Sequence, residues 1–330
     1  MPKVSVIIPT YNNPKQLERS INSVLGQTYK DIEVIIVNDG STVDYADLRS
    51  QFSNNKNILF FDKDNEGPGL ARQFGLNKST GKYINYLDAG DELLPKKIEK
   101  QVAILNSNTN IILTYGLSMI EGNSKVLHRP KMNRSEFEDV LKIAVATRKW
   151  HTSSPLWRYK KKENYWSNYF NGEDVYHDFT VAIENREDAH FLDEILVNLT
   201  YDNPDGGLSN ASDLEKNHLR FVKDTVDLNL YILEKLKSAK LLKFKQYREG
   251  LSERIYHASM RVYLTGYKEE SLFLLKTAKK TTKSTIKYIE ILILYIVIMA
   301  PLKRKRPIFQ FLYKVRRRIL SSNIHQYRYI

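Results

Sequence analysis

Val-Ser-Val-Ile-Ile-Pro-Thr-Tyr-Asn, residues 4–12, forms the first regular stretch of the chain and decides its fold class. The β-branched run Val4–Ile8 predicts a strand buried on both faces, as in a parallel sheet, and Pro9 ends it. Pro14 can start a helix, and the apolar side chains after it recur at helical spacing. These residues therefore predict a strand-to-helix unit whose strand ends in the polar group Thr10–Asn12.

The following residues repeat this unit. We expect strands at 32–37, 58–61 and 82–87, and helices at 45–52, 70–77 and 93–105. Such repetition predicts an α/β fold with a mostly parallel sheet flanked by helices. Ligands bind these sheets at the carboxyl ends of the strands, where the chain carries Asp39, Asp88 and Asp91. The sequence therefore predicts an acidic site at that edge.

The second half of the chain is less regular and then becomes helical. We expect a helix at 175–184, a strand at 195–201, and amphipathic helices at 218–236 and 247–264. An apolar segment, 288–300, follows. The chain thus predicts an α/β body followed by a helical C-terminal region.

Composition excludes several classes of protein. The chain has 330 residues, no cysteine and a net charge of +13, so disulfides, Cys-ligated zinc and thiol nucleophiles are excluded. Residues 276–330 hold 14 basic side chains and one acidic side chain, Glu290, so the excess charge belongs to this tail. The remainder is neutral, which excludes a uniformly basic nucleic-acid-binding protein. Met1-Pro2-Lys3 leads straight into a strand instead of a secretory signal, so we expect a cytoplasmic protein.

Two short acidic motifs have more than one interpretation when each is taken alone. Asp88-x-x-Asp91 at a strand end suits Mg²⁺ or Mn²⁺, but Asp91 can equally cap a helix. Gly172-Glu173-Asp174 can supply a general base or simply begin a helix.

Taken together and in order, six segments resemble the family 2 glycosyltransferases. They are 4–12, 17–28, 33–41, 65–75, 81–91 and 172–174. The resemblance is dense over 1–95 and thinner to about 210. It implies a GT-A fold and an inverting transferase (EC 2.4) that uses a nucleotide-diphosphate sugar.

The resemblance also implies which residues bind the donor. Pro9, Thr10 and Tyr11 would border the nucleobase, with Tyr11 stacking on it. Asp39 would accept a hydrogen bond from the base, which favours uracil. Asn65 would belong to the same donor site. Arg72 would contact the diphosphate or the sugar of the donor, and Asp88 and Asp91 would flank the metal-bound diphosphate.

By the same resemblance, Asp174 would be the general base, with Glu173 supporting it, and Asp88 and Asp91 would hold Mn²⁺ or Mg²⁺. Family members commonly read Asp-x-Asp-Asp at this point, and this chain has Gly90 at the third position, a usual metal ligand. Either Asp91 takes that role or Asp88 binds the metal through water.

We therefore expect a catalytic domain at 1–210, with a nucleotide-sugar half (1–95) and an acceptor half (96–210), and a helical region at 211–330. The expected reaction moves a sugar from a UDP-sugar to a hydroxyl of a cell-surface glycan precursor such as a capsule or teichoic acid. The alternative is a non-catalytic sugar-nucleotide-binding or scaffold subunit. A nucleotidyltransferase is disfavoured, because no phosphate-binding loop follows the first strand.

Several other residues keep two interpretations. Aromatic side chains in the acceptor half can form a sugar-stacking platform or ordinary core: Trp150, Trp157, Tyr165, Trp166 and Tyr169. The histidines lack paired ligand spacing and are assigned structural roles: His151, His177, His190 and His218. Ser209, in the loop 202–209, can reach the diphosphate.

The basic tail, 276–330, indicates what the protein binds and gives no information on its reaction. Its apolar segment is too short for a ~30 Å membrane core, but apolar and basic groups together suit an anionic membrane surface. Homo-oligomerisation through the C-terminal helices is the structural alternative, and a nucleic-acid partner is not expected. We therefore expect a peripheral protein on the inner face of the plasma membrane.

Overall fold

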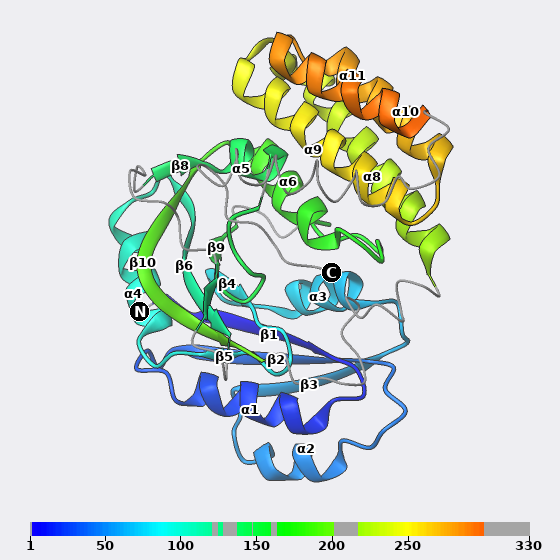
Figure 1. Ribbon diagram of the computed structural model, residues 1–330. Coiled ribbons are helices and arrows are strands. Elements are labelled where there is room, and N and C mark those ends of the chain that lie inside the picture. The colour runs from blue at the N-terminus through cyan, green and yellow to red at the C-terminus, as the bar shows by residue number, and fades with distance from the viewer. Residues whose placement is uncertain are drawn as a thin grey trace.

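The computed structural model describes residues 2–120, 125–127, 137–146, 148–159, 164–200 and 217–299. The strands are β1 Val4–Thr10, β2 Ile32–Asp39, β3 Ile58–Lys63, β4 Tyr83–Tyr86, β5 Glu92–Leu93, β6 Ile111–Ile120, β7 Lys125–Leu127, β8 Phe137–Asp139, β9 Leu156–Arg158 and β10 Asp188–Leu199. The helices are α1 Pro14–Leu25, α2 Ala46–Phe52, α3 Pro68–Lys78, α4 Lys97–Ser107, α5 Val140–Ala146, α6 Glu173–Asn185, α8 His218–Ser238, η1 Leu241–Lys243, α9 Lys245–Leu264, α10 Lys268–Thr281 and α11 Thr285–Met299. Figure 1 shows their arrangement.

The described strands form one sheet in the order β3-β2-β1-β4-β9-β6-β10-β5, with β7 beside β6 and β8 beside β10. Pairing is parallel from β3 to β4 and again between β6 and β10. Strand β9 joins these two parallel parts by pairing antiparallel with both β4 and β6. The expected α/β class with parallel β-α units is confirmed.

Side chains of β1 and β2 enter two separate cores, because successive residues of a strand point to opposite faces. Val6 and Ile8 pack with α1, α2 and α4 on one face. Ile7 and Ile35 pack with α3 on the other face, in a core that continues into α5, α6 and the C-terminal helices. The continuous apolar runs of the sequence are therefore explained by burial on both faces of the sheet (Figure 1).

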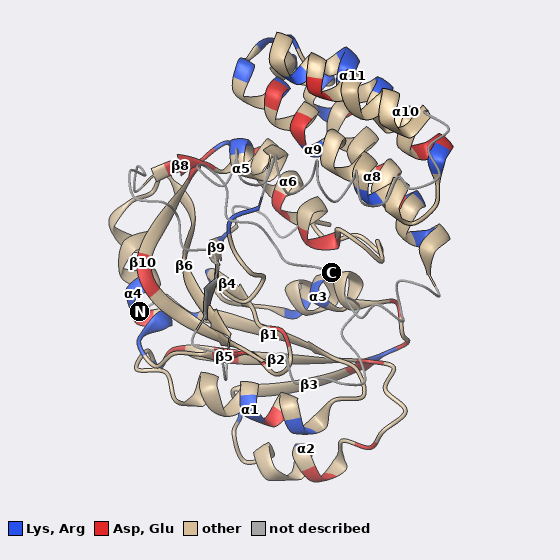
Figure 2. Ribbon diagram, viewed as in Figure 1, with Lys and Arg blue, Asp and Glu red and all other residues tan. Residues whose placement is uncertain are grey.

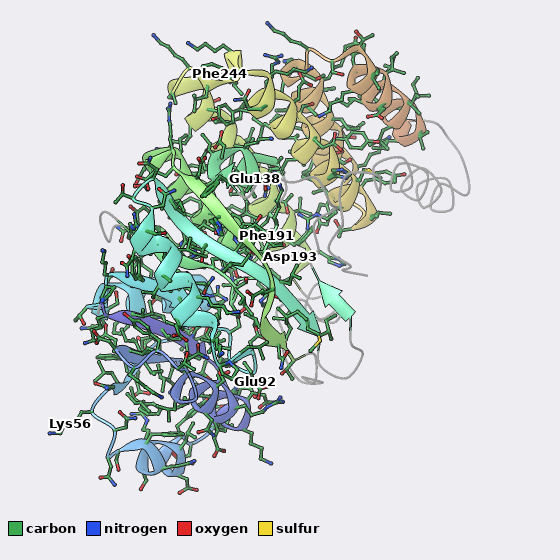
Figure 3. The ribbon with its side chains drawn as sticks, turned by 90° about the vertical axis from the view of Figure 1, so that its left-hand side faces the viewer. Lys56, Glu92, Glu138, Phe191, Asp193 and Phe244 are labelled. Carbon is green, nitrogen blue, oxygen red and sulfur yellow. The ribbon has the colours of Figure 1, made fainter. Side chains whose placement is uncertain are left out.

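Helices α8 to α11 form a separate helical layer next to α5 and α6 (Figure 1). Figure 3 places Lys56, just before β3, and Phe244, just before α9, at opposite ends of the molecule. Among the described residues, no helix has both the length and the apolar character needed to cross a bilayer.

Several predicted boundaries differ from those of the structure. The helix expected at 93–105 begins at Lys97, because Glu92–Leu93 pair with β10 as the short strand β5. The strand expected at 195–201 begins at Asp188, because its first residues pair with β6 and β8. The helix expected at 175–184 begins at Glu173.

Candidate active site

The loop Asp88–Asp91 leaves the carboxyl end of β4 and is fixed by its backbone. Gly90 N–H donates to Ser20 Oγ at 2.9 Å, and Thr200 Oγ1 donates to the Gly90 carbonyl at 2.8 Å. Gly90 has φ +109°, a conformation that side-chain-bearing residues rarely adopt. A Cβ at Gly90 would meet only ordinary contacts, the nearest being Gln16 Cβ at 3.5 Å. The backbone conformation, not a lack of space, therefore favours glycine here.

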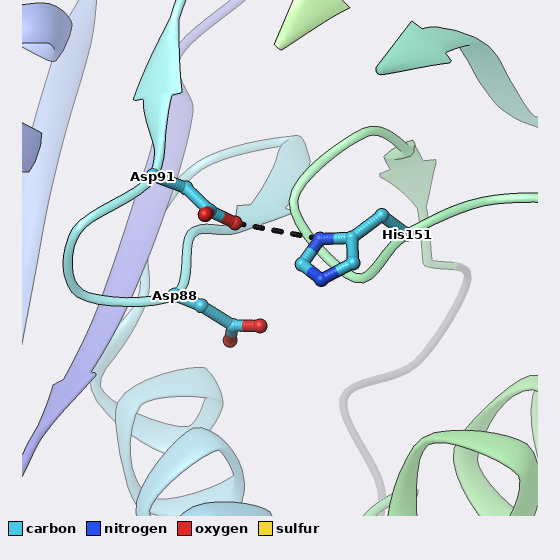
Figure 4. A group of neighbouring side chains, drawn as sticks. All are labelled: Asp88, Asp91 and His151. Carbon is cyan, nitrogen blue, oxygen red and sulfur yellow. Dashed lines mark ion pairs between the residues drawn. The ribbon is translucent and has the colours of Figure 1, made fainter. Parts of the chain in front are cut away.

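Asp88, Asp91 and His151 form a candidate metal centre at this loop (Figure 4). One potential ligand atom from each lies within 4.8 Å of the others. His151 Nδ1 is 3.4 Å from Asp91 Oδ2, which also accepts a hydrogen bond from Ser153 Oγ at 2.5 Å. Two carboxylates and an imidazole suit Mn²⁺, and the carboxylates alone suit Mg²⁺, so the residues present fit the expected ion.

The two aspartates of this centre have opposite electrostatic environments. Burial raises the pKa of Asp91 to about 6, and the nearby Asp88 carboxylate adds to the increase. Burial also acts to raise the pKa of Asp88, but the charges of Arg72, His151 and Arg148 and the hydrogen bond from Arg72 together outweigh it and lower that pKa. Because a buried carboxylate with a raised pKa is stabilised by a nearby cation, Asp91 is electrostatically suited to bind one.

Arg72 connects the metal centre with the Gly-Glu-Asp motif. Its buried guanidinium donates from Nη2 to Asp88 Oδ1 at 2.6 Å and from Nη1 to Glu173 Oε1 at 3.3 Å. The Cζ atom lies 4.8 Å from the ring centroid of Trp166. Both Nη groups of this predicted diphosphate ligand are thus engaged by carboxylates. Burial, followed by the Asp174 charge, raises the pKa of Glu173 to about 7.

Asp174, the predicted base, lies in the first turn of α6 and pairs with a second arginine. Arg148 Nη1 donates to Asp174 Oδ2 at 2.6 Å, and Arg148 Nε donates to Asp178 Oδ2 at the same distance. The Asp178 side chain is 1% exposed and also accepts from Trp150 Nε1 at 2.9 Å. The Asp174 side chain is 27% exposed, so it is accessible from solvent.

The residues predicted to bind the nucleobase lie at the carboxyl ends of β1 and β2. Tyr11 is 51% exposed, as a stacking platform requires. Thr10 Oγ1 and Tyr45 Oη lie 2.9 Å apart. Asp39 is buried and accepts from Lys63 Nζ at 2.9 Å and from the Gly67 N–H at 2.8 Å. Asn65 is exposed on the loop before α3, and Pro9 is buried within β1.

Two of these residues are not predicted from the sequence. His151, for which the sequence predicts a structural role, lies in the candidate metal centre, about 60 positions from the aspartates. Arg148 carries no sequence prediction. Their only signal is the polar run that surrounds Trp150, since neither residue has a characteristic spacing from a partner.

Burial decides two other predictions, one against the sequence interpretation and one, the structural role of His177, in its favour. The sugar-stacking interpretation was wrong for the acceptor-half aromatics that are buried in the core, namely Trp150, Trp157, Tyr165 and Trp166. His177 is a buried core residue whose Nδ1 lies 2.9 Å from Asp178 Oδ1. The loop 202–209, with Ser209, lies outside the described residues.

The chain belongs to glycosyl transferase family 2, whose family model matches residues 5–171. An uncharacterized glycosyltransferase of Rickettsia bellii is 43% identical over 125 residues, which is 38% of this chain and 18% of that protein. One from Nostoc is 34% identical over 152 residues, covering 44% of this chain and 46% of that protein. The chain thus spans less than half the length of these relatives.

Two solved structures share the fold at low sequence identity. Staphylococcus aureus TarS 1–349, in complex with UDP-GlcNAc, aligns with a TM-score of 0.55 and 16% identity, over 88% of this chain and 90% of that one. A mannosyltransferase from Pyrobaculum calidifontis, in complex with GDP-Man and Mn²⁺, aligns with a TM-score of 0.55 and 14% identity, over 97% and 87%. The GT-A fold implied by the resemblance is therefore confirmed.

Proposed function

We propose that the chain is an inverting glycosyltransferase that moves a sugar from a UDP-sugar to a hydroxyl of a cell-surface glycan precursor. One observation carries this proposal: Arg72 joins a cation-binding acidic pair to the Glu173-Asp174 motif, with 2.6 Å to Asp88 and 3.3 Å to Glu173. A leaving-group site and a proton acceptor are thereby held side by side. The TarS complex with UDP-GlcNAc supports a UDP-sugar donor.

In the proposed reaction, Asp174 takes the proton of the acceptor hydroxyl. The acceptor oxygen bonds to the anomeric carbon as the bond from that carbon to the diphosphate oxygen breaks, and attack from the opposite face inverts the configuration. Arg148 holds the Asp174 carboxylate, and Arg72 fixes Glu173 beside it. The Asp174 side chain is 27% exposed, whereas that of the neighbouring Glu173 is 15% exposed, so Asp174 is the more accessible of the two carboxylates in α6's first turn.

Asp88, Asp91 and His151 would hold Mn²⁺ or Mg²⁺, and the mannosyltransferase complex with Mn²⁺ supports such an ion. Such an ion would supply positive charge to offset the charge that develops on the departing diphosphate. Arg72 adds a fixed positive charge at the same place, without any rearrangement of the protein during the reaction.

We further propose that the chain works at the inner face of the plasma membrane, where capsule, teichoic acid and other polysaccharide precursors are built. The net charge of +13 concentrated in residues 276–330 supports a location at an anionic surface. Many such acceptors are lipid-linked or anionic polymers, and both would be concentrated near that surface.

Asp174→Asn tests the role of the base. We expect transfer to be lost and the donor affinity, measured by calorimetry, to stay within about twofold, because the amide keeps the shape but takes no proton. Asp193→Asn, an exposed aspartate of β10, is the matched control and should leave both quantities unchanged (Figure 3). Undiminished transfer by Asp174→Asn would remove Asp174 as the base.

Hydrolysis of UDP-sugars without acceptor separates this function from a scaffold role. A thermal-shift screen across UDP-sugars first identifies the donor that stabilises the fold. Slow release of UDP from that donor is expected of a transferase with an exposed base. A chain that binds the donor but releases no UDP, with or without candidate acceptors, would be a sugar-nucleotide-binding subunit.

A further inference from the structure

Helix α11 presents an exposed face without a single charged residue. From Thr285 to Met299, every exposed position except Thr285 is apolar: Ile286, Tyr288, Ile289, Leu292, Ile293, Ile296 and Met299. We call these seven residues the α11 face. Their exposed fractions run from 38% to 73% in a chain of which 27% of residues are charged. A contiguous apolar surface of this kind indicates a docking site.

The opposite side of α11 is the one that packs against the rest of the protein. Ile291, Leu294 and Ile298 are buried and pack into the core of the helical region. Lys287 turns toward α9, where its Nζ donates to the Glu249 carbonyl at 2.8 Å. The core of the chain therefore uses one side of α11, and the apolar residues of the opposite side remain exposed.

Basic residues precede the α11 face in the chain, and one of them contacts it. Lys279 Nζ lies 4.7 Å from the ring centroid of Tyr288, and Lys276, Lys280 and Lys283 are exposed nearby in sequence. No acidic residue occurs between Ser271 and Ile289. The charged positions of α10 and α11 are coloured in Figure 2. Positive charge therefore lines an apolar surface, as in helices that lie in the headgroup region of anionic bilayers.

The charge of the segment 276–330 favours an anionic membrane over a second copy of the chain as the partner of this face. Pairing with a second copy would bring together two segments, 276–330, each with 14 basic residues and one acidic residue. Their repulsion opposes a dimer, whereas anionic lipid headgroups would neutralise the same charges. A helix of 15 residues is about 22 Å long, too short to cross a ~30 Å hydrocarbon core but suited to lie along its surface.

We propose that the α11 face inserts into the headgroup layer of an anionic membrane, with the neighbouring lysines contacting lipid phosphates. The proposal specifies the surface used at the membrane location proposed above and is independent of the reaction. Its test measures binding only, so its failure would leave the glycosyltransferase proposal unaffected.

Flotation of the full chain with vesicles provides the first test. We expect binding to vesicles that contain phosphatidylglycerol, little binding to pure phosphatidylcholine, and weaker binding at high salt. Ile289→Glu/Ile293→Glu should lower partitioning about tenfold or more, because acidic groups replace inserted apolar ones. Leu219→Glu, at a 70% exposed position of α8, is the matched control and should bind as the unaltered chain does.

The absence of cysteine permits a second, site-specific test. An environment-sensitive fluorophore on Ile293→Cys should shift to the blue with phosphatidylglycerol vesicles, while the same label on Leu219→Cys should not. Unchanged vesicle binding by Ile289→Glu/Ile293→Glu, or an unshifted label at position 293, would overturn the proposal. Light scattering would identify the alternative, if the unaltered chain is a dimer and the double variant a monomer with unchanged vesicle binding.

Discussion

Arg148 donates from Nη1 to Asp174 Oδ2 at 2.6 Å while its Nε donates to Asp178 Oδ2, so one guanidinium holds the exposed carboxylate to the buried one. The Arg148 side chain is 7% exposed and that of Asp178 is 1% exposed. Asp178 is fixed in turn by Trp150 and His177. Buried side chains of the protein core thus fix the orientation of the carboxylate proposed as the base.

Arg148→Met should lower kcat about 10²-fold with little change in the donor KM, because a misplaced base affects the chemical step and not donor binding. It should also destabilise the fold by about 3 kcal/mol, since Asp178 would remain buried without its cation. Arg148→Met/Asp178→Asn removes the buried charge and should recover most of the stability but not kcat. Recovery of kcat together with stability would reduce Arg148 to a purely structural role.

His151→Ala should weaken Mn²⁺ binding at least tenfold, because it removes the only nitrogen ligand of the candidate centre. Calorimetric titration of the chain with Mn²⁺, without any sugar, measures this directly. His257→Ala, at a surface histidine that pairs with Glu253 on α9, should bind Mn²⁺ normally. Equal affinity in all three proteins would exclude His151 as a ligand.

Tyr11→Ala should weaken UDP binding roughly tenfold, because stacking of a base on an aromatic ring contributes about 1–3 kcal/mol. Tyr11→Phe keeps the ring and should retain nearly full affinity. Calorimetry with UDP alone separates this effect from any sugar contact. If the phenylalanine variant loses as much affinity as the alanine variant, the hydroxyl and not the ring face contacts the nucleotide.

Glu33 gives a pH-dependent stability. Burial would raise its pKa, but hydrogen bonds from Lys3, Ser5 and Thr80 outweigh it and lower the pKa to about 2. Because the folded-state pKa lies below the ordinary value of 4.5, the stabilisation is full above pH 4.5 and disappears as the pH falls through about 2. The half-exposed Lys3 partner limits its size to roughly 2–3 kcal/mol.

Urea unfolding at several pH values measures this contribution. Glu33→Gln should be less stable than the unaltered chain at pH 7, and the difference should shrink steadily between pH 4.5 and pH 3. Glu234→Gln, a 65% exposed residue of α8, should show no such trend. A constant difference for Glu33→Gln across this range would assign its effect to packing instead of charge.

Periodicity predicts the β-α units at the N-terminus because the strands β1, β2 and β4 are almost entirely buried and their helices present apolar side chains at helical spacing. Val4–Thr10 and Pro14–Leu25 illustrate this, since each element is specified by neighbours in sequence. The start of strand β10 could not be predicted in the same way. Its first residues are held by β6 and β8, which lie elsewhere in the chain, and the pairing shifts register between Leu192 and Ile195.

The residues of the candidate site differ in the same way: some are specified by local sequence and others only by the tertiary fold. Asp88, Asp91, Glu173 and Asp174 lie in short motifs at element ends, where a sequence pattern can mark them. Arg148 and His151 enter the site from an irregular segment between α5 and β9, and only the tertiary fold brings them to those carboxylates. Burial of the acceptor-half aromatics likewise depends on packing between β9 and α6, for example Trp157 at 4.9 Å from His177.

Gly90 also limits what a substitution in this loop can achieve. An aspartate at this position would have to adopt a φ of +109°, a conformation that costs about 1–3 kcal/mol for such a residue. Ser20 and Thr200 bond the Gly90 backbone, so a change of this angle would disturb two hydrogen bonds. Adding a third carboxylate to the candidate metal centre would therefore lower the stability of the loop that carries the other two.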